Sequence, residues 1–569
     1  MRNNAYKKAM DKIPMRADFE AETAALLKQK GAKRPRFPRR ARLATAGLAA
    51  CVALAIGVPA ILNRVVPAAS KSDASNALVL DAAESTSEPL PDSEGFAAFA
   101  PVPVQDSNAE EYAYIRENGF RSVLTSPLST FAADVDTASY ANVRRMLLAG
   151  ETVPKDAVRI EEMINYFNYD YPEPEGGAPF SVTTQIAPCP WNADAKLLLV
   201  GLQAKGIDES ERPNSNLVFL IDVSGSMDSP DKLRLAQCAF LLLTDELRAG
   251  DRVSIVTYAG TESVVLEGAD VEDKAEIMSA IEGLFAGGST AGGAGIVTAY
   301  EIAEKYFIEG GNNRVILATD GDLNVGITSE GELTRLIEEK RETGVYLSVM
   351  GFGTGNLKDN KLEALADNGN GNYAYIDSLL EAKKVLVEEL GATFFTVAKD
   401  VKLQIEFNPE RVASYRQIGY ENRALADEDF ADDAVDGGEI GAGHRVTVLY
   451  EIVEATGEGE SGLKYQTGGT TGSDEYLTVS VRAKAPDGDE SELYEYPVGE
   501  ESAHDEMPDG MKFAAAVAEV GMLLRGSEYA GTASYESALA LLESVAGTRD
   551  DPYQDEFAYL VRRLARAAE

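Results

Sequence analysis

The sequence predicts a central α/β domain with a mostly parallel sheet, flanked by antiparallel strands and closed by helices. Two apolar runs, 216–221 and 314–319, are separated by helical patterns, as in a parallel sheet with helices on both faces. After residue 396 the period changes, because residues 401–407 alternate between apolar and polar side chains. This alternation is typical of an antiparallel sheet that has one face in water.

One pair of strands in the α/β domain is expected to be antiparallel. Residues 253–258 and 263–266 are both strand-like, and only residues 259–262 separate them. A connection this short allows a hairpin but no parallel crossover. The sheet should therefore carry one antiparallel edge strand, and residues 345–350 and 372–376 supply its last strands.

The regions on either side of the α/β domain predict a second fold. Apolar residues recur at helical spacing over 160–167. Strands from 180–203 and from 401–482 are expected to join one β-sandwich, with the α/β domain inserted between them. Three further helical patterns close the chain, at about 509–526, 534–546 and 553–567.

Three oxygen-bearing side chains follow the first apolar strand. Asp222, Ser224 and Ser226 alternate along the chain, so all three can turn toward one point above the strand end. One carboxylate and two hydroxyls suit a hard cation such as Mg²⁺, which prefers oxygen ligands and keeps part of its water. The alternative interpretation is a Ser-rich turn that caps a helix.

Two more turns support the metal interpretation. Thr290 lies in the glycine-rich stretch 287–293, and Asp320 follows the apolar run 314–319. In an open α/β sheet, ligand sites form at the carboxyl ends of the parallel strands. We therefore expect Thr290 and Asp320 at the same edge of the sheet as Asp222.

These five positions, from Asp222 to Asp320, match in order the metal-ion-dependent adhesion site of the von Willebrand factor A (VWA) domain. The chain resembles this family over about 214–396. The resemblance implies a Rossmann-like fold and a bound Mg²⁺, with Ca²⁺ or Mn²⁺ as alternatives. It also implies a protein partner that offers a carboxylate to the metal, and it does not imply catalysis.

The similarity continues on both sides of this domain. The stretches 127–131, 134–140, 159–167 and 190–192 resemble the N-terminal extension of a bacterial VWA subgroup. The stretches 398–402 and 418–423 resemble the C-terminal domain of the same subgroup. This wider resemblance sharpens the expected architecture more than the expected function.

Residues 43–62 predict a single transmembrane helix. They carry no charge, and twenty residues can span a bilayer core of about 30 Å. Eight Lys and Arg residues lie in 28–42, so the positive-inside rule predicts a cytoplasmic N-terminus and an extracytoplasmic body. A cleaved signal peptide ending near Val66 and a lipoprotein signal at Cys51 are the alternatives.

Composition argues against two classes of function. The net charge is -40 although residues 1–42 are basic, so the rest of the chain is strongly acidic and would repel nucleic acid. The chain has no G-x-S-x-G motif and only two histidines, and the loop that begins at Asp320 departs from an EF-hand at Val325 and Gly331. We expect a binding protein and not an enzyme.

The sequence favours a membrane-anchored protein that docks a protein partner through the metal, with an undetermined oligomeric state. One alternative is a transmembrane sensor of the cell envelope that signals through the cytoplasmic head. Another is a structural protein whose metal only stabilises the fold. The expected organisation is a basic cytoplasmic head (1–42), a signal anchor (43–62), a disordered acidic stalk (63–119), an N-terminal VWA-associated region (120–213), the VWA domain (214–396) and a C-terminal domain with strands and then helices (397–569).

Overall fold

The computed structural model describes residues 110–568, apart from 134–135, 209, 211, 289–292, 322–329, 356, 436, 457–471, 487, 489 and 548–550. The predicted cytoplasmic head, the predicted anchor at 43–62 and most of the predicted stalk lie outside the described residues. Within the described part of the chain, no helix is both long enough and apolar enough to cross a membrane. The anchor at 43–62 stays a prediction.

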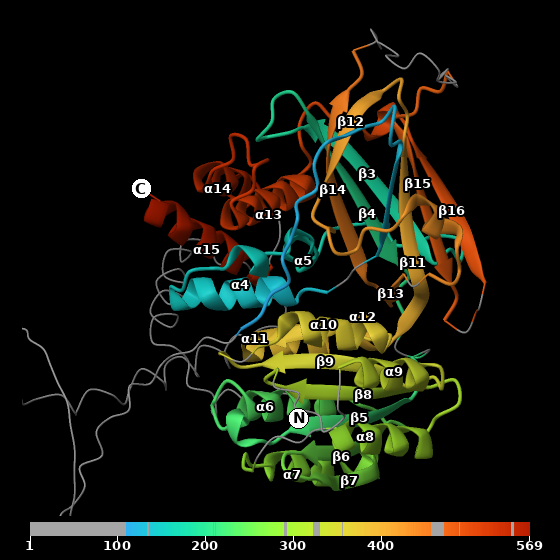
Figure 1. Cartoon of the computed structure of the whole chain (residues 1–569), viewed down its shortest axis with the longest axis vertical. Coiled ribbons are helices and arrows are strands. Elements are labelled where there is room, and N and C mark those ends of the chain that lie inside the picture. Colours follow the sequence, from blue (N-terminus) through green and yellow to red (C-terminus); the bar gives the residue numbers. More distant parts are fainter. Residues whose placement is uncertain are drawn as a thin grey trace, which may run out of the picture. The chain divides into compact units, whose positions relative to one another are not determined.

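The α/β domain is built on a six-stranded sheet with the order β10-β9-β8-β5-β6-β7 (Figure 1). All neighbouring strands are parallel except β6 and β7, which form an antiparallel pair at the edge. The predicted hairpin is therefore confirmed. The strand bounds are Ser215–Asp222 (β5), Arg252–Tyr258 (β6), Glu262–Asp270 (β7), Asn312–Thr319 (β8), Tyr346–Phe352 (β9) and Tyr373–Ile376 (β10).

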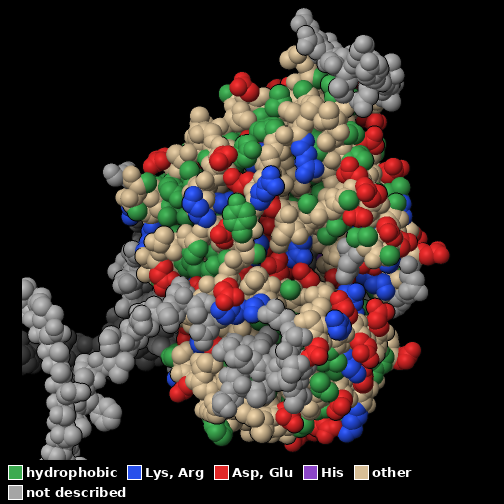
Figure 2. Space-filling view, viewed as in Figure 1, with side chains coloured by type: hydrophobic (Ala, Val, Ile, Leu, Met, Phe, Trp, Pro, Cys, Tyr) green, Lys and Arg blue, Asp and Glu red, His purple; other side chains and the backbone are tan. Residues whose placement is uncertain are grey.

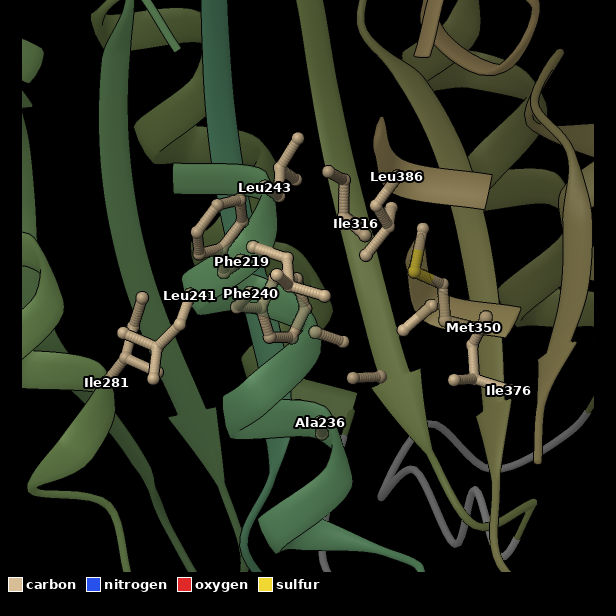
Figure 3. Packing of buried hydrophobic residues seen from close by; sticks show 14 of the residues in the cluster. Phe219, Ala236, Phe240, Leu241, Leu243, Ile281, Ile316, Met350, Ile376 and Leu386 are labelled. Carbon is tan, nitrogen blue, oxygen red and sulfur yellow. The ribbon is translucent and has the colours of Figure 1, made fainter. Parts of the chain in front are cut away.

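Helices cover both faces of this sheet because its strands bury side chains on both sides. On β5, Phe219 packs toward α6 and stacks on Phe240 with ring centroids 4.4 Å apart (Figure 3). Val218 and Leu220 point to the other face and pack with α8, α9 and α10. The helix bounds are Leu233–Glu246 (α6), Lys274–Glu282 (α7), Gly293–Lys305 (α8), Glu330–Arg341 (α9), Asp359–Asn368 (α10), Leu379–Lys383 (α11) and Leu390–Phe394 (α12), with a π-helical turn at Lys384–Glu388.

Strands from before and after the α/β domain form two antiparallel sheets that share one apolar core. In the first sheet, ordered β1-β12-β14-β4-β3, β4 precedes the α/β domain and pairs directly with β14, which follows it. The predicted insertion is therefore confirmed. The first sheet comprises Arg121–Ser122 (β1), Val412–Ile418 (β12), Arg445–Glu454 (β14), Lys196–Ala204 (β4) and Phe180–Pro188 (β3). The second comprises Gly438–Gly441 (β13), Thr396–Phe407 (β11), Leu477–Lys484 (β15), Ser491–Val498 (β16) and Leu128–Ala132 (β2), which pairs with β11.

The two sheets differ in how much of their outer face meets water. Along β15, buried residues alternate with partly exposed ones, as the sequence pattern predicted. In contrast, β4 and β14 bury residues on both faces, because Leu197, Leu199 and Leu449 pack against the C-terminal helices. The expected wet face holds only for the second sheet. The helices on this side of the first sheet are Ile160–Asn165 (α5), Asp509–Arg525 (α13), Tyr535–Ser544 (α14) and Pro552–Ala568 (α15), and Ala138–Ala149 (α4) lies between them and β10 of the α/β domain.

Charged side chains join the α/β domain to α4 and α5. Arg144 on α4 binds Asp377 and donates a 2.8 Å hydrogen bond to Glu381 of α11. Arg159 donates to Asp359 at the start of α10, at 2.5 Å. Figure 2 shows acidic and basic side chains lying close together in the band between the two parts. These arginine–carboxylate pairs are buried, so ion pairs add to the apolar contacts of α4 at this boundary.

The chain contacts the folded body earlier than the sequence suggested. Glu110 pairs with Arg145 at 3.1 Å, and its Oε1 accepts a hydrogen bond from the backbone N–H of Gly355. Glu111 pairs with Lys358 at 2.6 Å. The folded part therefore includes residues 110–119, which the sequence pattern places in the stalk.

Candidate metal-binding site

Asp222 is the last residue of β5, and its carboxylate is fully buried. Its Oδ1 accepts a 2.8 Å hydrogen bond from the backbone N–H of Ser224. The turn that follows, Gly225–Met227, brings the hydroxyl oxygens of Ser224 and Ser226 to 2.8 Å from each other. The first three predicted site residues thus lie together at the carboxyl end of the strand.

Asp320 lies at the same edge because β8, which ends one residue before it, is the parallel neighbour of β5. It is 1% exposed. Thr319, the preceding residue, turns its hydroxyl toward Oδ2 of Asp222 at 3.5 Å. The strand register therefore brings together two carboxylates that are separated by nearly a hundred residues in the sequence.

Thr290 lies outside the described residues, but the start of its loop contacts the site. The backbone N–H of Gly287 donates to the carbonyl of Val223 at 2.8 Å. The backbone N–H of Gly225 donates to the carbonyl of Gly288 at 3.1 Å. These two bonds attach the glycine-rich loop to the turn that carries Ser224 and Ser226.

The environment of Asp222 makes its negative charge costly. Burial, together with a smaller effect of the nearby charge of Asp320, raises the pKa of this carboxyl to about 6. Among the described residues, no lysine or arginine forms an ion pair with Asp222. A cation bound beside Asp222 would supply the missing compensation.

The donor set fits a hard divalent cation. Its oxygens come from two carboxylates and two hydroxyls, which suit Mg²⁺, Mn²⁺ or Ca²⁺ better than a softer metal. The described residues contain no cluster of three or more His, Cys, Asp or Glu side chains that could hold a metal. Hydroxyls would therefore have to complete the ligand set, as in the sequence prediction.

Lys232 is a further charged group in the site that the sequence did not reveal. It directly precedes α6, and its Nζ lies 2.9 Å from Oδ2 of Asp320. No local pattern could have found this pair, because 88 residues separate its members. The pair exists only because β8 ends beside the start of α6.

Comparison with known proteins agrees with this architecture. The model of the von Willebrand factor type A domain family matches residues 216–389, and the model described as von Willebrand factor matches 106–199. The model of the C-terminal region of the uncharacterized protein YfbK matches 392–567. YfbK of Escherichia coli (strain K12) is 44% identical over 471 residues, which cover 80% of this chain and 81% of YfbK. The chain belongs to the YfbK family.

Other relatives share less of the chain. The uncharacterized protein sll0103 of Synechocystis sp. is 31% identical over 185 residues, which cover 32% of this chain and 43% of that protein. The solved structure of von Willebrand factor type A from Catenulispora acidiphila has 19% identity and a TM-score of 0.38, and the match covers 65% of this chain and 87% of that one.

Membership of this family confirms the resemblance that the sequence motifs suggested. The α/β domain is a VWA domain, and the regions on either side of it match bacterial relatives that carry the same parts. VWA domains are typically interaction modules and not enzymes, and they commonly bind a divalent metal. The protein therefore belongs to a class that recognises other proteins.

Proposed function

We propose that this YfbK-family chain is a membrane-anchored binding protein that docks a protein partner through a divalent cation on its VWA domain. Mg²⁺ is the proposed ion, and Ca²⁺ or Mn²⁺ would fit the same oxygens. Residues 43–62 anchor the chain, with the N-terminus in the cytoplasm and the VWA domain outside. The partner contributes a carboxylate to the open position of the metal.

The observation that carries this proposal is the buried carboxylate of Asp222. A buried charge without a partner of opposite charge is destabilising, so it persists where it has a use. Asp222 lies beside the hydroxyls of Ser224 and Ser226 and not beside an arginine. An ion bound at this edge of the sheet would take oxygen ligands from the protein on one side. Its coordination position on the other side would stay open for a ligand from the partner.

Each residue has a proposed part in holding the ion. Asp222, Ser224, Ser226 and Thr290 hold the ion directly or through water. Asp320 anchors a bound water. These oxygens leave the ion with a positive charge, which favours a carboxylate as the last ligand.

The first test is a Mg²⁺ titration of the purified full chain by calorimetry. We expect saturable binding to the wild-type chain, and its loss in Asp222→Asn and Ser226→Ala. Asp228→Asn is the matched control, because Asp228 is an exposed carboxylate on the same turn. Equal binding by the wild-type chain and Asp222→Asn would contradict the proposal.

The second test asks whether the metal mediates contact with a partner. Phe285 is 82% exposed on the loop that leads to Gly287, so a photo-crosslinking residue placed there would report on the rim of the site. In intact cells we expect an adduct at position 285 that disappears with Asp222→Asn. A crosslinker at Val265, on the exposed strand β7, should give no such dependence. An adduct that persists in Asp222→Asn would argue for metal-independent docking or a purely structural ion.

The sensor hypothesis is a second candidate, supported by the contacts of residue 110. Glu110 reaches the backbone of Gly355, in the loop that follows β9 at the metal-bearing edge of the sheet. The N-terminal part of the chain therefore enters the body beside the site. If the protein signals through its head, deletion of residues 1–30 should abolish the response to partner binding while leaving Mg²⁺ affinity intact. An unchanged response would exclude this role.

A further inference from the structure

Lys232 places a positive charge inside the candidate metal site. Its side chain is 9% exposed, and its Nζ lies 2.9 Å from Oδ2 of Asp320. The aliphatic part lies over Gly353, where a Cβ would come within 2.3 Å of Cγ of Lys232. Gly353 also has a φ of +75°, so both its lack of a Cβ and its backbone conformation favour glycine at this position. The backbone thus leaves room for the lysine to reach the carboxylate.

The presence of Lys232 changes the charge of the site in each state. Asp222 and Asp320 carry two negative charges and Lys232 carries one positive charge, so the metal-free site has a net charge of -1. A divalent cation would reverse this to one net positive charge. Without Lys232, the loaded site would be neutral. Charges this deeply buried are weakly screened, so the difference acts strongly on whatever binds next.

We propose that the charge of Lys232 has two effects on this site. It weakens the binding of the metal, and it makes the metal-loaded site prefer a carboxylate as the next ligand. This inference rests on the proposed metal site. The ammonium group repels an incoming divalent cation, which lowers the affinity of the site for metal. Once the cation is bound, the same ammonium group leaves the site positive, and a carboxylate then binds more tightly than water or a neutral carbonyl.

The two effects have opposite signs, which separates this role from a structural one. A lysine that only supported the fold would, on removal, weaken metal binding and carboxylate binding together. A lysine with no influence on the site would change neither. Only the electrostatic role predicts that removing Lys232 strengthens metal binding and weakens carboxylate binding.

The experiment uses the purified full chain, Mn²⁺ and acetate. Electron paramagnetic resonance measures free Mn²⁺ and so its dissociation constant, and broadening of the ¹³C signal of labelled acetate by the Mn²⁺-loaded protein measures carboxylate binding. We expect Lys232→Met to bind Mn²⁺ roughly tenfold more tightly and acetate roughly tenfold more weakly than the wild-type chain. Lys232→Arg keeps the charge and should leave both constants near those of the wild-type chain.

Lys340→Met is the matched control. Lys340 pairs with Glu304 at 2.8 Å and is also mostly buried, but it lies at the end of α9, at the opposite edge of the sheet. Its loss should change neither constant. Lys232→Gln is a second variant, because it also removes the charge but keeps a side chain that can donate a hydrogen bond to Asp320. It should shift both constants in the same directions as Lys232→Met, and circular dichroism confirms that each variant is folded.

The outcomes separate the two levels of the proposal. If the wild-type chain binds no Mn²⁺, the proposed metal site is wrong and this inference is wrong with it. If the wild-type chain binds Mn²⁺ but Lys232→Met changes both constants in the same direction, or neither, the inference alone is overturned. If Lys232→Met does not fold, the folded Lys232→Gln variant decides, and constants that shift in the same direction or not at all would overturn the inference.

Discussion

Two regions of this protein bury carboxylates beside different partners. Where the VWA domain meets α4, Asp377 and Glu381 both bind the guanidinium of Arg144. At the candidate metal site, the partners of Asp222 among the described residues are hydrogen-bond donors, and Asp320 binds a lysine. Both regions remove carboxylates from water, so burial alone does not distinguish them.

The difference lies in the cation that each region supplies. A guanidinium offers several donors in a fixed plane and binds two carboxylates at once, which leaves no place for another ion. At the candidate metal site Lys232 pairs with Asp320, and among the described residues no lysine or arginine pairs with Asp222, whose neighbouring hydroxyls offer ligands for an ion from solution. A buried carboxylate in direct contact with an arginine is typical of a structural contact, whereas one that has hydroxyls and no cation beside it is a candidate for binding an ion from outside.

The largest effect is expected at the domain boundary. Arg144→Met would leave Asp377 and Glu381 buried without their cation, at a cost of about 3–5 kcal/mol in the free energy of unfolding. Denaturant unfolding measures this loss. Arg562→Met is the control, because Arg562 and Glu543 form a more exposed pair whose removal should cost less than about 1 kcal/mol. Equal losses would show that the boundary pairs are no stronger than surface pairs.

The candidate metal site should respond in the opposite way to loss of charge. Asp222→Asn removes a buried charge that has no cation, so at pH 8 the metal-free variant should be as stable as the wild-type chain or about 1 kcal/mol more stable. Wild-type protein should gain about 2.7 kcal/mol from Mg²⁺ at about a hundred times Kd, and the variant should gain nothing. Thermal unfolding with and without Mg²⁺ tests both statements. The matched change Asp377→Asn should destabilise the protein, and stabilisation there would remove the contrast.

Glu519 on α13 tests what burial does without either kind of partner. Its Oε2 accepts a hydrogen bond from Ser537, its Oε1 has no partner, and burial raises its pKa to about 7. Because the folded state favours the protonated form, the stabilisation is complete below the unfolded pKa of about 4.5 and is lost as the pH rises through 7.

We expect the wild-type chain to lose about 1–3 kcal/mol of stability, relative to Glu519→Gln, between pH 4.5 and pH 8. Urea unfolding of both proteins across this range measures the difference. The variant should be the more stable protein at pH 8. Parallel pH profiles for the two proteins would show that Glu519 titrates normally in the folded state.

The smallest effect is expected where the N-terminal part enters the body. Glu110→Ala removes the pair with Arg145 and the bond to the amide of Gly355, at a cost of about 1 kcal/mol. Hydrogen exchange at the amide of Gly355 should become faster. Glu111→Ala is the control, since Glu111 is exposed and does not bind that amide. Unchanged exchange at Gly355 would show that Glu110 does not stabilise the loop that follows β9.

Several parts of the fold could be predicted because their causes are local. The short link between β6 and β7 permits only a hairpin, and the spacing of Asp222, Ser224 and Ser226 places three oxygens above one strand end. The outer face of β14 could not be predicted. Its burial depends on α5, which contacts β14 from before the VWA domain, and on α13, which begins more than fifty residues after β14 and packs on α5 in the same apolar cluster.

The sequence alone determined the class of the domain, the hairpin at its edge and the oxygens offered to a metal. These follow from side-chain period and from residues close together in the chain. Only the tertiary structure decided the charge of the site, because Lys232 and Asp320 meet through the parallel register of β5 and β8 and the position of α6. Electrostatic interactions depend on distance in space, so whether a buried carboxylate has a cationic side chain beside it is decided only when the chain has folded.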